Sequence, residues 1–288
     1  MLTPRRSRLG SALLLPLLGG ALLCAGAAEA GAPLDLYYER SLMAAAGARC
    51  GLFPAEVRAA LAASAAQARN AALRAGLAGS EVDAVAGEAA DRARTTPCAS
   101  SDLATAASRV RAAFEGWSRT TRVSYPGAGG GWTADRTVYR SPSWRLVEAA
   151  PDGAAFGIAG DLQDPAALAA VLTSDGGAPY AARLKFRDPA RDAQPWLAAT
   201  GQAALPPQPA LRTVFAEAEA PAGPGLSQGG RTAVAFRFPA AAAAALATLD
   251  PRERFAVEFL LPGGQVRTAV FEVGDFAAGR AFLAMGER

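Results

Sequence analysis

The stretch G-L-S-Q-G at residues 225–229 fits G-x-S-x-G, the pattern around the nucleophile of many serine hydrolases. Such a serine needs a buried strand before it, a helix after it and a histidine as its base. Here P-A-G-P at 221–224 precedes Ser227 and cannot form a central strand, and the chain contains no histidine. A Ser-Lys pair would have to use Lys185, the only lysine, and no S-x-x-K is present. The sequence therefore predicts a turn around Ser227, with no catalytic residue.

Paired carboxylates are the other chemistry open to a chain without histidine, as in glycoside hydrolysis. Glu217 and Glu219 would share one face if 211–219 is a strand. Two acids on a polar strand face are more often a solvated surface, so we expect no catalysis from them. The chain also lacks the phosphate-binding G-x-x-x-x-G-K-[ST], the zinc-binding H-E-x-x-H and an EF-hand loop. The sequence predicts no metal site and no cofactor.

Tryptophan and arginine, which are enriched at binding hot spots, occur together shortly after residue 131. Trp132 and Trp144 lie close in sequence to Arg136, Arg140 and Arg145. These five residues are the candidate binding site for a ligand or a partner protein. The alternative, which is the more common use of such side chains, is packing in the core or at its edge.

Cys50 and Cys98 are the two cysteines that follow the N-terminal segment. An even number of cysteines in an exported protein predicts a disulfide. Their separation of 48 positions fits neither a C-x-x-C redox motif nor a zinc knuckle. A zinc site without histidine would also need carboxylate ligands. We therefore expect a structural disulfide between Cys50 and Cys98.

Residues 1–30 have the three-part layout of a secretory signal peptide. Arginines near the start are followed by an apolar run from Leu9 to about Ala28 and by the A-x-A cleavage pattern that ends at Ala30. Cleavage near Ala30 and a periplasmic or secreted location are therefore predicted. Two alternatives stay open: the apolar run is long enough for an uncleaved anchor, and Cys24 is the residue that a lipoprotein would modify. A leucine in place of a small residue before Cys24 disfavours lipidation.

Removal of residues 1–30 changes the charge balance of the chain. The full sequence has 29 basic and 26 acidic residues, and residues 1–30 hold three Arg and one Glu. The remainder thus has 26 basic (29 − 3) and 25 acidic (26 − 1) residues, a net charge of +1. So small a charge gives no reason to expect nucleic acid as a partner. Stable membrane insertion after cleavage is not expected either.

Residues 31–120 are predicted to form an Ala-rich domain of four helices. Pro54 suits the first turn of a helix, and Ser101 is expected to cap the last one. Mostly alanine faces bury little area each, and a disulfide from the first helix to the start of the fourth would offset that weakness. The helices are expected over 34–49, 54–75, 81–94 and 102–118.

A glycine-rich linker is expected over 121–131, followed by an α+β domain with a mainly antiparallel sheet over 132–288. Glu258 and Arg267 would face each other across a hairpin in one of the registers that its turn allows. A final helix is expected from Asp275 to about Met285. The strand patterns lie at 180–187, 231–238, 254–261 and 265–273, and the last two form the hairpin around P-G-G at 262–264.

Two segments of this domain are alike and suggest an internal duplication into repeats 132–205 and 206–288. Each repeat has a proline-initiated, Ala-rich segment that is closed by Asp, predicted as a helix, and followed by a strand. These segments are 164–175 and 238–250. The alternative is that alanine-rich sequence aligns with itself through composition alone.

The fold class expected from these features is α+β: a disulfide-linked helical bundle followed by an α+β domain. The expected function is that of an exported, non-enzymatic binding or interaction protein of the bacterial cell envelope, with an envelope protein or a small ligand as partner. The alternative is a periplasmic hydrolase that works through carboxylates. In composition and plan the chain resembles exported proteins of GC-rich Gram-negative bacteria, and this resemblance assigns no site.

Overall fold

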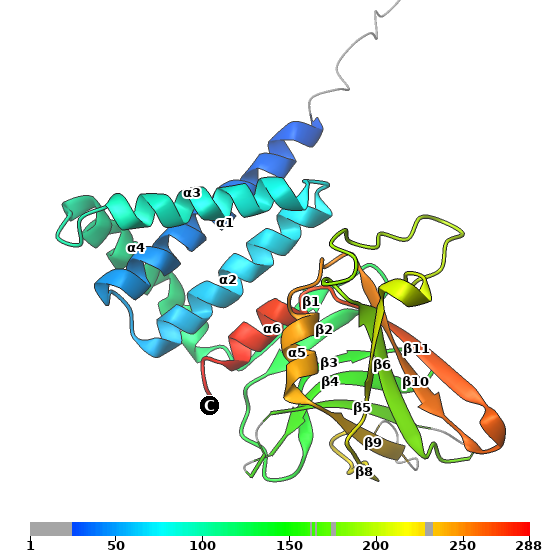
Figure 1. The fold of residues 1–288 in the computed structure, drawn as a ribbon. Coiled ribbons are helices and arrows are strands. Elements are labelled where there is room, and N and C mark those ends of the chain that lie inside the picture. The colour runs from blue at the N-terminus through cyan, green and yellow to red at the C-terminus, as the bar shows by residue number, and fades with distance from the viewer. Residues whose placement is uncertain (1–24, 162, 165, 174–176, 228–232) are drawn as a thin grey trace, which may run out of the picture.

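The computed structural model of the protein describes residues 25–161, 163–164, 166–173, 177–227 and 233–288. It is a mixed α+β protein, in which a layer of helices lies beside two antiparallel sheets (Figure 1). Most of the predicted signal peptide, residues 1–24, lies outside the described residues. Within the described part, no helix has both the length and the apolar character needed to cross a membrane.

The helical layer consists of four helices that correspond to the four predicted ones. The helix α1 packs against both α2 and α3. Ser100, and not the predicted Ser101, precedes α4, and its Oγ accepts a hydrogen bond from the N–H of Leu103 (3.5 Å). The bounds are α1 (Ala25–Cys50), α2 (Ala55–Arg74), α3 (Gly79–Thr95) and α4 (Ser101–Arg119).

The predicted disulfide between Cys50 and Cys98 is confirmed, with a Cα–Cα distance of 5.6 Å. Cys50 is the last residue of α1, and Cys98 lies in the connection between α3 and α4. The bond therefore fixes the end of the first helix close to the start of the fourth. Few large side chains are buried in this layer, so the buried apolar area contributes little to its stability. The covalent link between the helices adds stability that this small area does not supply.

The strands form a seven-stranded and a four-stranded sheet, and every pairing among the described residues is antiparallel. The first has the order β1-β2-β3-β4-β5-β9-β8 and the second β11-β10-β6-β7. The strands are β1 (Arg122–Pro126), β2 (Gly131–Asp135), β3 (Ser143–Ala149), β4 (Ala154–Gly160), β5 (Ala167–Thr173), β6 (Ala181–Arg187), β7 (Leu211–Phe215), β8 (Ala218–Pro221), β9 (Ala233–Phe238), β10 (Arg254–Leu260) and β11 (Val266–Glu272).

Phenylalanine rings hold the two sheets together. The ring of Phe156 on β4 lies 4.8 Å from that of Phe255 on β10 and 5.7 Å from that of Phe271 on β11, measured between centroids. All three side chains are almost fully buried. The chain passes from the small sheet to the large one between β7 and β8, where the N–H of Glu217 bonds the carbonyl of Arg237.

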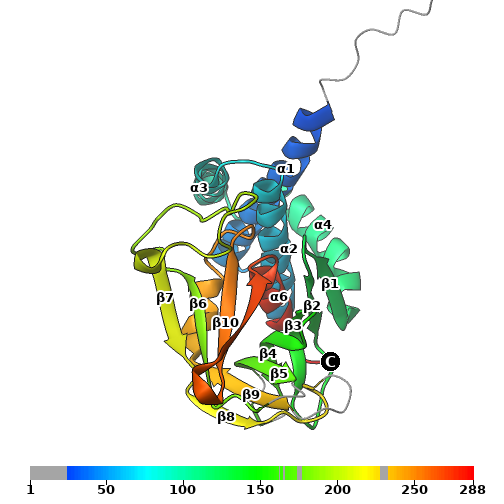
Figure 2. The same ribbon diagram turned by 90° about the vertical axis from the view of Figure 1, so that its right-hand side faces the viewer.

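The helix α6 (Phe276–Leu283) joins the helical layer to the large sheet, and the two views place it between α2 and strands β2 and β3 (Figures 1 and 2). The ring of Phe276 lies 5.0 Å from that of Trp132 on β2. On the other side, Nδ2 of Asn70 in α2 donates to Oδ1 of Asp275 (2.9 Å). Helices and sheets therefore share one buried hydrophobic cluster.

The helix predicted over 164–175 is wrong, because residues 167–173 form the strand β5. This strand lies between β4 and β9, and its residues are buried on both faces. The sequence of a strand that is buried on both faces is an unbroken apolar run. The spacing of apolar residues in such a run does not distinguish a strand from a buried helix. The matching helix of the second predicted repeat does form, as α5 (Ala240–Leu246). The duplication itself stays a hypothesis.

The hairpin of β10 and β11 is present, but the expected pair across it does not form. Its register places Arg267 opposite Phe259 and Glu258 opposite Thr268. The turn between the strands is a short 3₁₀ helix, Pro262–Gly264, and it sets this register. Glu258 instead binds Arg183 and Lys185 of the neighbouring strand β6, at 2.5 and 2.7 Å.

Candidate functional site

Ser227 lies at the end of a turn, as far as the structure describes this segment. The N–H groups of Leu226 and Ser227 both bond the carbonyl of Gly223, at 2.9 and 3.1 Å. Gln228 and Gly229 of the G-x-S-x-G stretch lie outside the described residues. A turn held in this way differs from the strand-to-helix junction that exposes a nucleophilic serine.

Glu217 and Glu219 do not lie together on one regular strand. Glu217 falls between β7 and β8 at the corner where the chain changes sheets, and Glu219 lies on β8. Both residues are exposed. No described group of three or more Cys, Asp or Glu side chains is arranged to hold a metal ion.

Three of the five residues of the predicted Trp and Arg site lie inside the protein. Trp132 is 2% exposed, and its Nε1–H donates to the carbonyl of Glu272 (3.2 Å). Arg136 is 1% exposed, donates to the carbonyl of Gly286 (2.6 Å) and lies over the ring of Phe282. These contacts hold the C-terminal segment against β2 and α6.

Arg145 is the third buried member, and it donates to Oε1 of Glu287 (2.7 Å) and to the carbonyl of Asp135 (3.0 Å). Trp144 is half-buried and donates to the carbonyl of Leu226 (3.1 Å), while Arg140 is exposed. The structure therefore does not bring the five residues into one open patch.

A cleft of about 620 Å³ opens where the small sheet, the end of α2 and a long loop meet. One wall is the loop from residue 188 to 207, which forms neither helix nor strand along its described length. Loops of more than about 12–15 residues without such structure are uncommon in compact domains and are often functional. The side chains that give the cleft its chemical character are Arg74, Trp196, Gln202, Arg252, Arg254 and Glu272.

Two of the three arginines in the cleft are held in place by buried carboxylates. Arg252 donates from Nε and from Nη2 to the two oxygens of Asp250, both at 2.9 Å. Arg74 donates from Nη2 to Oδ2 of Asp275 (2.8 Å), a residue that is 2% exposed. Burial by itself raises the pKa of Asp250, but its bonds to Arg252 outweigh this effect and lower that pKa below the ordinary range.

Arg254 has no such partner: it is exposed and forms no ion pair with any residue that the structure describes. It lies opposite Glu272 in the register of β10 and β11. The carboxylate of Glu272 is turned to the β1–β2 turn instead, where it accepts the N–H groups of Ala128 (3.0 Å) and Gly129 (3.2 Å). Arg254 therefore presents its donors to the cleft.

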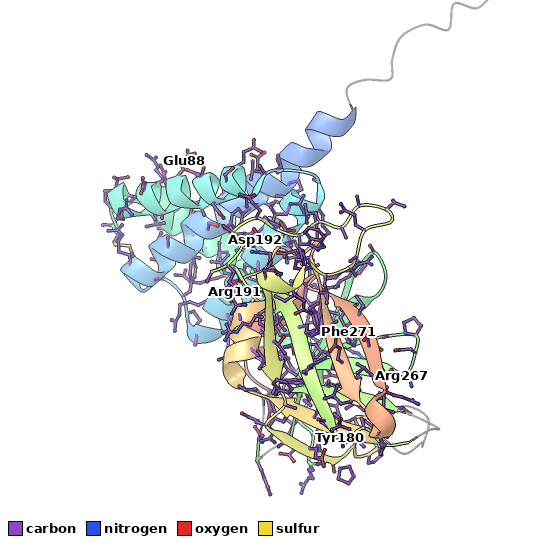
Figure 3. All side chains as sticks on the ribbon, turned by 45° about the vertical axis from the view of Figure 1, so that its right-hand side comes forward. Glu88, Tyr180, Arg191, Asp192, Arg267 and Phe271 are labelled. Carbon is purple, nitrogen blue, oxygen red and sulfur yellow. A yellow bond between two sulfur atoms is a disulfide. The ribbon has the colours of Figure 1, made fainter. Side chains whose placement is uncertain are left out.

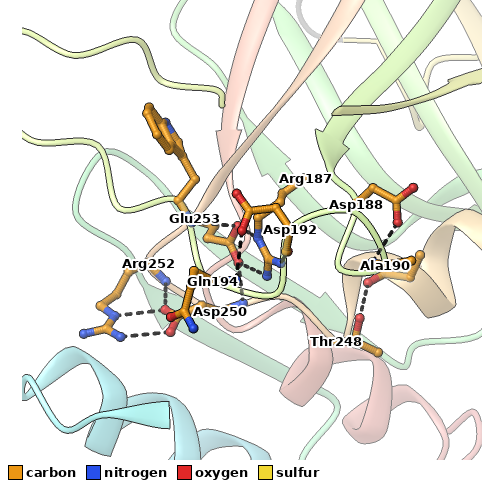
Figure 4. A network of polar contacts seen from close by, with 11 residues as sticks. Arg187, Asp188, Ala190, Asp192, Gln194, Thr248, Asp250, Arg252 and Glu253 are labelled. Carbon is orange, nitrogen blue, oxygen red and sulfur yellow. Dashed lines mark hydrogen bonds and ion pairs between the residues drawn. The ribbon is translucent and has the colours of Figure 1, made fainter. Parts of the chain in front are cut away.

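The base of the long loop is fixed by a buried ion pair, drawn in Figure 4. Arg187 at the end of β6 donates from Nε and Nη2 to the two oxygens of Glu253, at 2.6 and 2.8 Å. Its Nη1 reaches the carbonyl of Asp192 in the loop. Glu253 also accepts the N–H of Trp196 (3.3 Å), and the indole of Trp196 donates to the carbonyl of Ala203 (3.1 Å). The loop wall is thereby attached to the sheet.

Glu148 lies behind the β1–β2 turn, and it is 5% exposed. Both of its oxygens accept the N–H of Glu272, at 3.4 and 3.2 Å. Burial, with a smaller contribution from the charge of Glu272, raises the pKa of Glu148 to about 7. This carboxyl does not line the cleft, so Glu272 is the one acid among the residues that do.

Sequence reasoning missed the residues of this cleft. Two signals were present: the long connection between the strand at 180–187 and the next strand pattern, and the run D-P-R-E-R at 250–254. Comparison with protein-family models, with curated proteins and with solved structures finds no match to this chain.

Proposed function

We propose that this protein is an exported, non-enzymatic binding protein of the bacterial cell envelope, and that its ligand or partner binds in the cleft between the loop 188–207 and the small sheet. The observation that carries this proposal is an open cleft in which two of the three lining arginines, Arg252 and Arg74, are fixed by buried carboxylates. Rigid, preorganised groups lose little entropy on binding. The disulfide and the N-terminal signal pattern support an exported location.

The alternative, a hydrolase that works through two carboxylates, has less support. Glycosidase carboxyls lie about 5–9.5 Å apart, with both open to the substrate. The cleft offers Glu272, whose oxygens are bound to the N–H groups of Ala128 and Gly129. The neighbouring Glu148 is buried, with both oxygens bonded to the N–H of Glu272.

The test is a photocrosslink from inside the cleft in living cells. A photoreactive amino acid replaces Gln202, an exposed residue of the loop wall, in the full chain expressed in its native host. The matched control replaces Glu88, which is exposed on α3, well away from the sheets (Figure 3). Mass spectrometry of the purified protein detects a small-molecule adduct as an increase in mass and a protein adduct as a larger species.

The proposal expects an adduct of defined mass from position 202 and none from position 88. A crosslink of similar yield from both positions indicates non-specific contact and contradicts a site in the cleft. Unmodified protein from position 202, in cells that export it normally, contradicts the proposal as well.

A further inference from the structure

Three guanidinium groups converge on one cleft although the chain outside residues 1–30 is nearly neutral. Arg74 comes from the end of α2, Arg252 from the segment before β10, and Arg254 from β10 itself. The buried acids Asp250 and Asp275 offset the charge of Arg252 and Arg74, but they lie behind these side chains. A ligand in the cleft therefore meets the arginine donors and not Asp250 or Asp275.

Each of these arginines keeps hydrogen-bond donors that no described residue uses. Arg252 commits Nε and Nη2 to Asp250, which leaves Nη1. Arg74 commits Nη2 to Asp275, which leaves Nη1 and Nε. Arg254 keeps its whole guanidinium, with five N–H donors in a planar arrangement. Such donors suit the oxygens of a carboxylate or a phosphate, and their bonds to an anion are stronger than those to a neutral acceptor.

Glu272 does not compete for these donors, because its two oxygens accept the N–H groups of the β1–β2 turn. A ligand cation would have to approach a lining that holds three arginines and one acid. It would also displace Glu272 from the turn or share its oxygens. The cleft lining therefore favours an anion over a cation.

The size and the aromatic wall of the cleft add a second requirement for the ligand. A volume of about 620 Å³ lies within the range of sites for small organic molecules, roughly 300–1,000 Å³. The half-buried ring of Trp196 is held by two hydrogen bonds, one from its indole and one from its backbone N–H. An indole fixed in this way offers a flat apolar surface to a planar group.

We infer that the cleft binds an organic anion, whose carboxylate or phosphate oxygens accept hydrogen bonds from Arg254 and from the remaining donors of Arg252 and Arg74, and whose planar part packs on Trp196. This inference rests on the proposed function and adds the chemical class of the ligand. A carboxylate ligand and a phosphate ligand would share this chemistry: an oxyanion beside a flat apolar group.

The test is calorimetric titration at neutral pH and low salt. The protein carries the oxidised disulfide and lacks residues 1–30, the predicted signal peptide. The probes are small molecules of similar shape that differ in charge. Benzoate represents a carboxylate and phenyl phosphate a phosphate. Benzamide is the neutral analogue and benzamidine the cationic one. Folding of the shortened chain is first established by its thermal unfolding transition, and the full chain purified from its host is titrated as well.

The matched variants are Arg254→Gln and Arg94→Gln, the second an exposed arginine on α3. We expect benzoate, phenyl phosphate or both to bind, and both neutral and cationic analogues to bind at least about tenfold more weakly, because a charge-assisted bond is lost. Arg254→Gln should weaken binding of the anion by about tenfold or more, and Arg94→Gln should leave it unchanged. The stronger of the two anions identifies the oxyanion.

Equal affinity for benzamide and benzoate, or no effect of Arg254→Gln, overturns the inference. Absence of binding by every probe also overturns it. A crosslinked adduct from position 202 would then leave the proposed function standing with another class of ligand. If position 202 gives no adduct either, both the proposed function and the ligand class fail.

Discussion

Replacement of Glu148 by glutamine should change how the stability of the protein depends on pH. The side chain is 5% exposed, and both of its oxygens accept the N–H of Glu272. Desolvation by burial, and then the charge of Glu272, raise its pKa from 4.5 to about 7 in the folded protein. The hydrogen bond from the N–H of Glu272 and, more weakly, the charge of Arg254 act in the opposite direction, but burial outweighs them. Glutamine keeps a carbonyl for the N–H of Glu272 and cannot titrate.

The sign of the effect follows from which state holds the proton. Between pH 4.5 and 7 the folded protein keeps Glu148 protonated, while the unfolded chain releases that proton. The stability that this group contributes is therefore fully present below pH 4.5 and is lost as the pH rises through about 7. Moving a pKa from 4.5 to about 7 corresponds to about 3 kcal/mol in the free energy of unfolding.

The assay is urea unfolding of the wild type and Glu148→Gln at intervals from pH 4.5 to 8, with the disulfide oxidised. The free energy of unfolding of Glu148→Gln, minus that of the wild type, should rise by about 3 kcal/mol across this range. Titration of the carboxylates that do not interact with Glu148 cancels in the difference. The exposed Glu88→Gln serves as the control and should give a flat difference. A difference for Glu148→Gln that stays flat, or that falls as the pH rises, would refute the reasoning.

Four further variants test a buried ion pair, the disulfide and two glycine positions. Glu253→Gln leaves a buried guanidinium without its charge partner, which should cost about 3–5 kcal/mol in urea unfolding and expose the loop 188–207 to limited proteolysis. Replacing Cys50 and Cys98 by serine should cost about 4 kcal/mol on the chain-entropy account, with wild type under reducing conditions as the comparison. Gly157→Ala puts a Cβ 1.8 Å from a backbone oxygen of β3 and should destabilise by at least about 1–3 kcal/mol. Gly87→Ala, in open space on α3, should stabilise by roughly 0.5–1 kcal/mol.

The helical layer is the part of the fold that the sequence predicts best. Its four helices carry local signals, such as Pro54 before α2 and the polar residues before α4, and these signals act within one turn of the chain. The disulfide follows from a count of cysteines. The strand β5 was predicted as a helix, because its buried alanines and leucines lack the alternation of a half-buried strand. Its identity as a strand depends on pairing with β4 and with β9, and β9 is distant in sequence.

The candidate site was not predictable to the same degree, because its residues come from segments that are remote in sequence. Arg74 binds Asp275 across 201 positions. Arg136 was predicted to lie in a surface site, yet its guanidinium is buried against backbone carbonyls and the ring of Phe282. The presence of an arginine in the sequence does not indicate whether its side chain faces a ligand or packs in the core, since the long aliphatic part of the side chain packs well in either setting.

The segment 250–254 contains one arginine that is held by a buried acid and one that has no ion-pair partner among the described residues. Asp250 and Glu253 are buried, and each binds an arginine, while Arg252 and Arg254 reach the cleft. A buried ion pair adds little net stability, but removing one partner is costly. Loss of Asp250 or Glu253 should therefore affect folding and the cleft together. Arg254 has no ion-pair partner among the described residues. Its loss should therefore weaken ligand binding with a smaller effect on folding, and this contrast distinguishes a binding role from a structural one.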